Sequence, residues 1–252
     1  MNKILANIKI QLKNSFSRDI FKFILFIHPL IHSFIMYMLY KNIEIKFYIE
    51  YALLGTGLLS FWSVILFSSA SDIERERNEG TLSTIFISPT NFFLLIFSKL
   101  IGNTILGFLP ILISSTFLFM LRPVSLSFNF LYFLLNLICG IIVLTLLSTI
   151  FSFLFAISKN TRLLMNNLEY PLYIISGLVF PIEILPSFLQ KIAALFPLYW
   201  INENLRNILC SNFEIEDIFI LIIFFIVYLC LIKLLYINFM NKIKTKGSIE
   251  VM

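Results

Sequence analysis

Long apolar runs separated by short polar stretches dominate the pattern of this chain. Six runs are long enough to cross about 30 Å of hydrocarbon as helices. They lie at residues 23–40, 50–70, 100–121, 130–156, 166–181 and 217–236. Since helices satisfy their own backbone hydrogen bonds in lipid, the pattern predicts an all-α membrane protein with six transmembrane helices in one domain at 23–236.

The first 22 residues follow another pattern, in which an apolar residue recurs at every fourth position and forms a stripe along a helix. The stripe is Ile4, Ile8, Leu12, Phe16 and Ile20, and the basic residues beside it are Lys3, Lys9, Lys13, Arg18 and Lys22. Anionic headgroups attract the cations of such a helix to the membrane surface. We therefore expect an N-terminal cytoplasmic interfacial helix at 1–22 and no cleavable signal.

The segment 181–216 is apolar but contains no uninterrupted run that could span. Pro181, Pro186 and Pro197 divide it into short pieces, because proline lacks the helix donor and clashes with the preceding turn. We expect short re-entrant helices on the extracytoplasmic side, with their backbone shielded by protein.

Composition excludes a soluble domain. The chain is 59% hydrophobic and 13% charged, with a mean hydropathy of +0.94, whereas soluble domains are about half apolar and a quarter charged. The three cysteines, Cys139, Cys210 and Cys230, form neither a disulfide framework nor a zinc-binding pattern.

The net charge is +5, and the cations gather on one side of the predicted spans. They are the N-terminal cations, Arg75, Arg77, Lys99, Lys159, Arg162, and Lys242, Lys244 and Lys246 of the basic tail at 237–252. Basic loops face the cytoplasm, so both termini are expected there, in a multi-pass protein of the cell membrane. The sequence has no basic run with interleaved aromatic residues, so we expect no nucleic-acid partner.

The sequence contains no P-loop, GxGxxG, HExxH or serine-elbow motif. We therefore expect that the chain is not an enzyme, that it binds no cofactor and that it has no ATPase site of its own. Any work that it performs must be driven by an ion gradient or by another subunit.

The densest group of charges lies in 71–90, SDIERERNEGTLSTIFISPT. The first part can continue the helix of the second span, with side chains paired at i,i+3 and i,i+4. These are Glu74, Arg75, Glu76, Arg77 and Glu79. Gly80 would end this helix and Thr81 would begin a shorter one that stops at Pro89. Leu82, Ile85 and Phe86 share a face of that second helix, and an exposed apolar face in the cytoplasm predicts a protein partner.

Two stretches resemble the type-2 ABC exporter permeases. ERNEGTLSTIFISP is similar to the family signature E-R-x-x-G-T-L-x-x-L-x-x-(S/T)-P, with isoleucine at 85 where leucine is usual. The matching residues are Glu76, Arg77, Gly80, Thr81, Leu82, Ser88 and Pro89. SGLVFPIEILPSFLQKIAALFPLYWINENLR resembles the family's stretch after the fifth span, through Ser176, Gly177, Phe180, Pro181, Leu185, Pro186, Pro197, Leu198 and Arg206. Trp200, Asn202 and Glu203 depart from that pattern in polarity or bulk.

The resemblance implies the membrane subunit of an ABC exporter. Two permease subunits, identical or paralogous, would sit in the lipid membrane on a pair of separate ATPase subunits that hold ATP and Mg. The segment 71–90 would be the coupling helix, and the second and fifth spans would line the substrate path. The expected extracytoplasmic gate is Gly177, Phe180, Pro181, Pro186, Pro197 and Arg206. Such exporters handle amphiphiles, among them drugs, peptide antibiotics, lipids and glycans.

Three ionisable residues of the predicted spans are candidates for a functional role. His28 and His32 are one turn apart, and either form a metal or proton site or make interhelical hydrogen bonds beside Pro29. No third histidine or carboxylate of a neighbouring span is expected to complete a metal site. Glu169 belongs either to the substrate path or to an interfacial pair with Arg162. Interhelical hydrogen bonds are expected from Asn103, Asn136, Asn166 and Asn167.

Two other classes are weighed against the exporter: a membrane-embedded enzyme and an ion-coupled secondary carrier. An enzyme would need acids, histidines or cysteines that converge within the membrane, and the only candidates are His28, His32 and Glu169. A carrier would need charged residues deep in discontinuous spans. The sequence favours the exporter.

Overall fold

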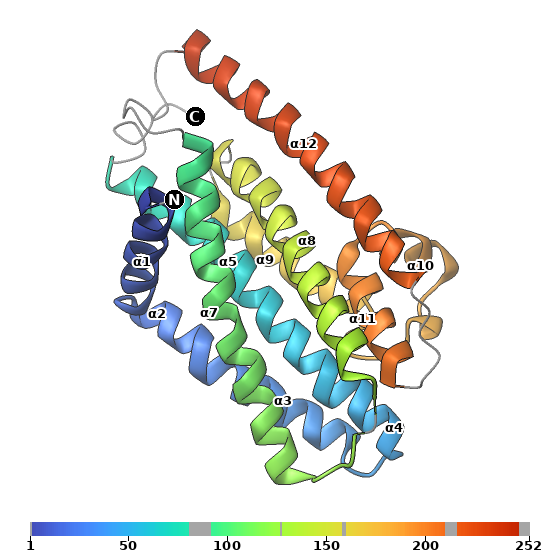
Figure 1. The fold of residues 1–252 in the computed structure, drawn as a ribbon. Coiled ribbons are helices and arrows are strands. Elements are labelled where there is room, and N and C mark those ends of the chain that lie inside the picture. Colours follow the sequence, from blue (N-terminus) through green and yellow to red (C-terminus); the bar gives the residue numbers. More distant parts are fainter. Residues whose placement is uncertain (1, 81–91, 127, 158–159, 210–215, 247–252) are drawn as a thin grey trace.

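The computed structural model describes residues 2–80, 92–126, 128–157, 160–209 and 216–246, and every regular element in these ranges is a helix. The N-terminal part contains α1 (Asn2–Phe16), α2 (Asp19–Lys22), the π-helix η1 (Phe23–Ile27), α3 (His28–Tyr40), α4 (Ile45–Phe47), the π-helix η2 (Tyr48–Gly55) and α5 (Thr56–Asn78). The C-terminal part contains α7 (Phe92–Leu121), α8 (Phe130–Ile157), α9 (Thr161–Ile175), the 3₁₀-helix η3 (Ile182–Ile184), α10 (Ser187–Ala193), α11 (Pro197–Leu209) and α12 (Asp217–Lys246). The long helices pack side by side in a bundle (Figure 1), which confirms the all-α prediction.

Five helical stretches are long and apolar enough to cross a membrane. They are Asp19–Tyr40, Ile45–Ser69, Leu94–Leu121, Phe130–Phe155 and Asp217–Asn238, and they correspond to five of the predicted spans. The remaining prediction, 166–181, falls on α9 and the turn after it. The 15 residues of α9 extend over about 22 Å, which is less than the hydrocarbon thickness. A multi-pass helical architecture is thus confirmed, and a sixth crossing stays a prediction.

The core of the bundle is built around α5. Trp62 is fully buried and meets Phe151 of α8 edge to face. Phe61 packs so closely on α7 that a Cβ atom at Gly107 would lie 2.8 Å from its ring. Helix α5 contacts α3, α7, α8 and α9, so a displacement of α5 would be transmitted to several neighbours.

The short helices α10 and α11 lie at one end of the bundle, whereas α1 and the C-terminal end of α12 lie at the other (Figure 1). Helix α11 packs against α8, where the Asn136 amide donates to the Ile201 carbonyl at 3.3 Å. On α7, the Asn103 amide donates to Asp72 of α5 at 2.9 Å. Interhelical hydrogen bonding by these two asparagines is therefore confirmed. Asn166 and Asn167 are exposed on α9 of the single chain.

Candidate functional site

The charged end of α5 continues the helix of the second span without interruption. The helix runs from Thr56 to Asn78, and Gly80 follows with a φ of 65°. This left-handed conformation commonly ends helices, and glycine adopts it without steric cost. One continuous helix therefore joins the buried centre of the bundle to its charged end.

Several charged side chains on this end of α5 form ion pairs. Arg75 Nε lies 4.0 Å from Glu79 Oε1, one helical turn away. The carboxylate of Glu76 is buried and pairs with Lys99 of α7. Glu74 and Arg77 also belong to α5, but their side chains lie outside the described part of the chain. The expected second helix lies entirely outside it, with Thr81, Leu82, Ile85, Phe86 and Pro89.

At the opposite end of the bundle, the prolines of 181–216 lie where short helices begin. Pro181 precedes η3, Pro186 precedes α10, and Pro197 is the first residue of α11. The proline ring fixes φ near the helical value and removes a donor that the first turn leaves unused. The segment is therefore divided as the sequence indicates, and the half-buried Phe180 lies at its beginning.

A buried arginine connects α11 to the turn that follows α9. Arg206 Nη2 donates to the carbonyl oxygen of Gly177 at 2.5 Å, and Gly177 has a φ of 65°. The Asn202 amide donates to the same carbonyl at 3.0 Å. Asn202 departs from the family pattern in the sequence, and here it supplies a second donor to a buried backbone group. Gly177 and Arg206 are thereby brought together.

Two tyrosines extend this cluster to the first and second spans. The Arg206 guanidinium lies 4.2 Å from the centroid of the Tyr51 ring, a cation–π distance. Tyr51 stacks on Tyr40, whose hydroxyl donates to the Val179 carbonyl at 2.7 Å. Burial raises the pKa of the Glu203 carboxyl, and Arg206 acts in the opposite direction. Arg206 and aromatic rings thus connect the segment 181–216 to the first and second spans.

A polar chain connects α9 and α5 inside the bundle. The Tyr173 hydroxyl donates to Glu169 Oε1 one turn away and also contacts the Ser63 hydroxyl. Tyr173 and Ser63 are buried, while Glu169 is half-buried. The carboxylate therefore has a partner within its own helix, which the i,i+4 spacing could have indicated; the Arg162 side chain lies outside the described residues.

The rings of His28 and His32 lie 4.1 Å apart between centroids, with their planes tilted by 34°. The acid that interacts electrostatically with His28 is Glu169. Helix α9 packs against α5, a neighbour that the chain order does not reveal. Among the described residues, no group of three or more His, Cys, Asp or Glu side chains could hold a metal ion.

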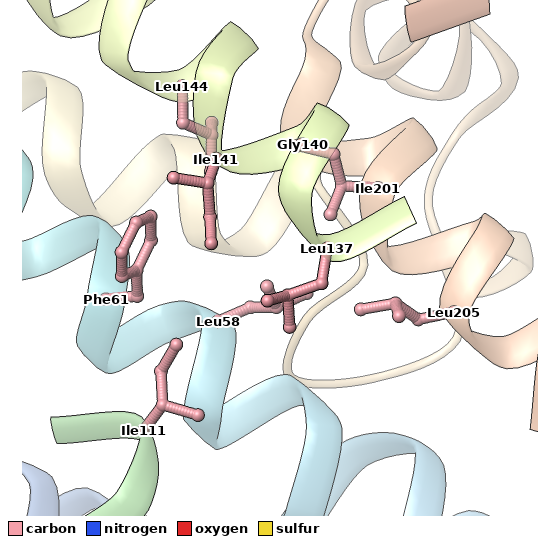
Figure 2. A pocket seen from close by; sticks show the side chains of 9 residues that line it. All are labelled: Leu58, Phe61, Ile111, Leu137, Gly140, Ile141, Leu144, Ile201 and Leu205. Atoms are coloured by element: carbon pink, nitrogen blue, oxygen red, sulfur yellow. The ribbon is translucent and has the colours of Figure 1, made fainter. Parts of the chain in front are cut away.

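An apolar cavity lies between α5, α7, α8 and α11 (Figure 2). Its lining residues are Leu58, Phe61, Ile111, Leu137, Gly140, Ile141, Leu144, Ile201 and Leu205. The cavity volume is about 10 Å³, roughly the space of one water molecule. It is too small to hold an amphiphilic substrate.

The apolar helical bundle, with its charged helix end and the proline-divided segment 181–216, defines a multi-pass membrane protein. The family model described as ABC-2 family transporter protein matches residues 31–233. The chain belongs to this family, and is a membrane component of an ABC transporter. A comparison with curated proteins gave no match. Family membership implies partnership with an ABC ATPase.

Proposed function

We propose that this chain is the permease subunit of an ATP-driven exporter of an amphiphile, with both termini in the cytoplasm of the cell. It pairs with a second permease subunit, identical or paralogous, and the two permease subunits together bind two ATPase subunits. ATP and Mg are bound by those subunits, and this chain supplies the path and the mechanical connection.

The observation that carries this proposal is the continuity of α5. Its buried part contacts α3, α7, α8 and α9, and its charged part ends at Asn78, just before Gly80, at the end of the bundle where α1 lies. A force applied by an ATPase to the segment 71–90 would therefore act on the centre of the bundle. Rigid-body motion of packed helices around a substrate path is how transporters alternate access.

The polar residues of α9 support a path between paired subunits. Asn166, Asn167 and Tyr170 are exposed on this helix, and Glu169 is half-buried beside them. Polar side chains in a membrane face protein or water in preference to lipid. We assign this face of α9 and the adjoining Ser63 side of α5 to the midline, where substrate would pass with Glu169, His28 and His32 nearby.

The cluster around Arg206 would form the extracytoplasmic gate. The helices η3, α10 and α11 would enter the outer leaflet as re-entrant pieces, and Gly177 and Arg206 would hold them on the spans. Opening outward would then require the Arg206 contacts with Tyr51 and with the Gly177 carbonyl to rearrange.

Co-purification from the native cell tests the exporter proposal. A tagged chain is expected to bring down an ABC ATPase subunit whose ATP hydrolysis is vanadate-sensitive and increases when the permease is present. Recovery of the chain without any ATPase, under conditions that preserve the membrane assembly, would contradict the proposal.

A double substitution then tests the coupling segment. Gly80→Asp with Leu82→Asp is expected to leave membrane insertion intact and to reduce the recovered ATPase at least tenfold, since charge would disrupt an apolar docking face. The matched control is Phe188→Asp, which places the same charge on an exposed residue of α10 at the other end of the bundle. Equal ATPase recovery with both variants would contradict the proposal that 71–90 is the coupling segment.

A further inference from the structure

The face of α1 that packs on the bundle carries two buried polar residues, Gln11 and Ser15, with Leu12 packed beside them. Ile4 and Phe16 of the predicted apolar stripe are exposed. The contact with α7 is close, because a Cβ atom at Gly102 would lie 3.3 Å from Gln11 Cγ. Helix α1 is therefore held by specific polar contacts with the bundle and presents apolar side chains outward.

Those contacts converge on a buried carboxylate of α5. Asp72 Oδ2 lies 2.6 Å from Gln11 Nε2 of α1 and 2.9 Å from Asn103 Nδ2 of α7. Gln11 Nε2 and the Ser15 hydroxyl also lie within hydrogen-bond distance of Asn103 Oδ1, at 3.1 and 3.0 Å. Three helices thus share one set of hydrogen bonds, and Asp72 is the carboxylate at its centre.

The second oxygen of the same carboxylate is paired as well. Asp72 Oδ1 lies 3.0 Å from Arg18 Nη2, just after α1, and Arg18 Nη1 donates to the Ser71 hydroxyl at 3.0 Å. One turn further along α5, Glu76 pairs with Lys99, one turn before Asn103 on α7. The charged end of α5 therefore contacts its neighbours at two successive turns: Asp72 bonds to α1, Arg18 and α7, and Glu76 pairs with α7.

We propose that Asp72 is the junction that makes α1, the N-terminal part of α7 and the charged end of α5 move as one unit. This inference rests on the proposed function, because the motion is the one that the ATPase would impose on α5. A buried carboxylate that loses its partners is strongly unfavourable, so sliding of α1 over α5 is opposed until the whole set of bonds breaks. Asp72 is a positioning residue: it would pass the displacement of α5 to the helix at the membrane surface.

Spin-label distances test this unit. Cysteines are placed at Lys9 on α1, Leu94 on α7 and Ser187 on α10, all exposed positions, in a chain whose three native cysteines are replaced. Two pairs, Lys9 with Leu94 and Lys9 with Ser187, are measured in the full chain co-purified with its ATPase. Measurements are made without nucleotide and after trapping with ATP and vanadate.

In the otherwise unmodified chain, the first distance is expected to stay constant and the second to shift on trapping. Asp72→Ala should broaden the first distance distribution and abolish the shift of the second, while vanadate-sensitive ATP hydrolysis continues. Gln11→Met, which keeps the volume and removes only the α1 donor, should broaden the first distribution in the same way. Asp19→Ala is the matched control, because Asp19 is an exposed acid that pairs only with Lys22 among the described contacts.

A first distance that changes on trapping in the unmodified chain, or that stays narrow in both Asp72→Ala and Gln11→Met, would overturn the proposal. Its failure can be told apart from that of the exporter function. If no ATPase co-purifies, the exporter proposal fails, and the nucleotide-free distributions of the same variants still decide whether Asp72 joins the three helices.

Discussion

At the residue scale, the position of the proline-divided segment 181–216 depends on a backbone conformation that few residues adopt. Gly177 has a φ of 65° and directs its carbonyl to both Arg206 and Asn202. A Cβ atom there would meet nothing closer than 3.5 Å, so steric crowding by neighbours is not the constraint. The constraint is the left-handed conformation itself.

Gly177→Ala is therefore expected to lower the free energy of unfolding by about 1–2 kcal/mol, the cost of that conformation for an L-residue. Gly57→Ala is the matched control: its Cβ would lie 3.6 Å from Ile111 Cγ2 in ordinary contact, within helix α5. It should be neutral or stabilising. Thermal unfolding in detergent micelles measures both, and an equal loss in the two variants would contradict the assignment.

Arg206 should resist even conservative replacement. Arg206→Lys keeps the charge but loses the planar group that lies over Tyr51 and reaches the Gly177 carbonyl. A decrease of about 2 kcal/mol in unfolding free energy is expected, since hydrogen bonds to charged groups contribute about this much. The comparison is Lys191→Arg on the exposed side of α10, which should change nothing measurable in the same unfolding assay.

Sequence motifs indicate Gly80, Gly177 and Arg206, because each belongs to a local pattern with a local backbone consequence. Asp72, Tyr51 and Tyr173 were not predicted. Their roles depend on partners that are distant in the chain, such as Gln11 for Asp72 and Ser63 for Tyr173. Hydrophobic periodicity contains no information about which helix lies opposite a polar side chain.

At the element scale, the apolar runs were sufficient to predict five spans, because length and hydropathy decide whether a helix can cross a bilayer. The sequence predicted an apolar stripe on α1 for the membrane interface, and it did not indicate that Gln11 and Ser15 would face the bundle. Periodicity identifies the apolar side of a helix, but in a membrane protein that side can face lipid while polar side chains face the bundle. The contact of α11 with α8 could not be predicted from the sequence either, since it depends on the space that Gly140 leaves for Ile201.

A double-mutant cycle tests that contact. A Cβ atom at Gly140 would lie 3.0 Å from Ile201 Cγ1, so Gly140→Ala should destabilise the protein by about 1–3 kcal/mol through overpacking. In an Ile201→Ala background the crowding is gone, and the same change should stabilise by up to about 1 kcal/mol through helix propensity. The sign of the Gly140→Ala effect on unfolding free energy is the readout, and the same sign in both backgrounds would refute the packing argument.

At the scale of the whole molecule, charge and architecture favour one orientation. Helix α1 and the end of α12 lie at one end of the bundle with the charged end of α5, and α10 lies at the other (Figure 1). The cations of the sequence gather at the first end, which the positive-inside rule assigns to the cytoplasm. An exporter whose ATPase is cytoplasmic requires this same orientation, so a topology measurement bears on the proposed function.

Ser17 and Ser187 provide a matched pair of exposed serines for that measurement, the first after α1 and the second at the start of α10. Each is changed to cysteine in a chain whose Cys139, Cys210 and Cys230 are replaced by serine. A maleimide that cannot cross membranes should label Ser187→Cys on intact cells, and should label Ser17→Cys only after the cells are permeabilised. The permeabilised sample also controls for the reactivity of each thiol. Labelling of Ser17→Cys on intact cells would place α1 and the charged end of α5 outside, where no ATPase could reach them, and would end the exporter proposal.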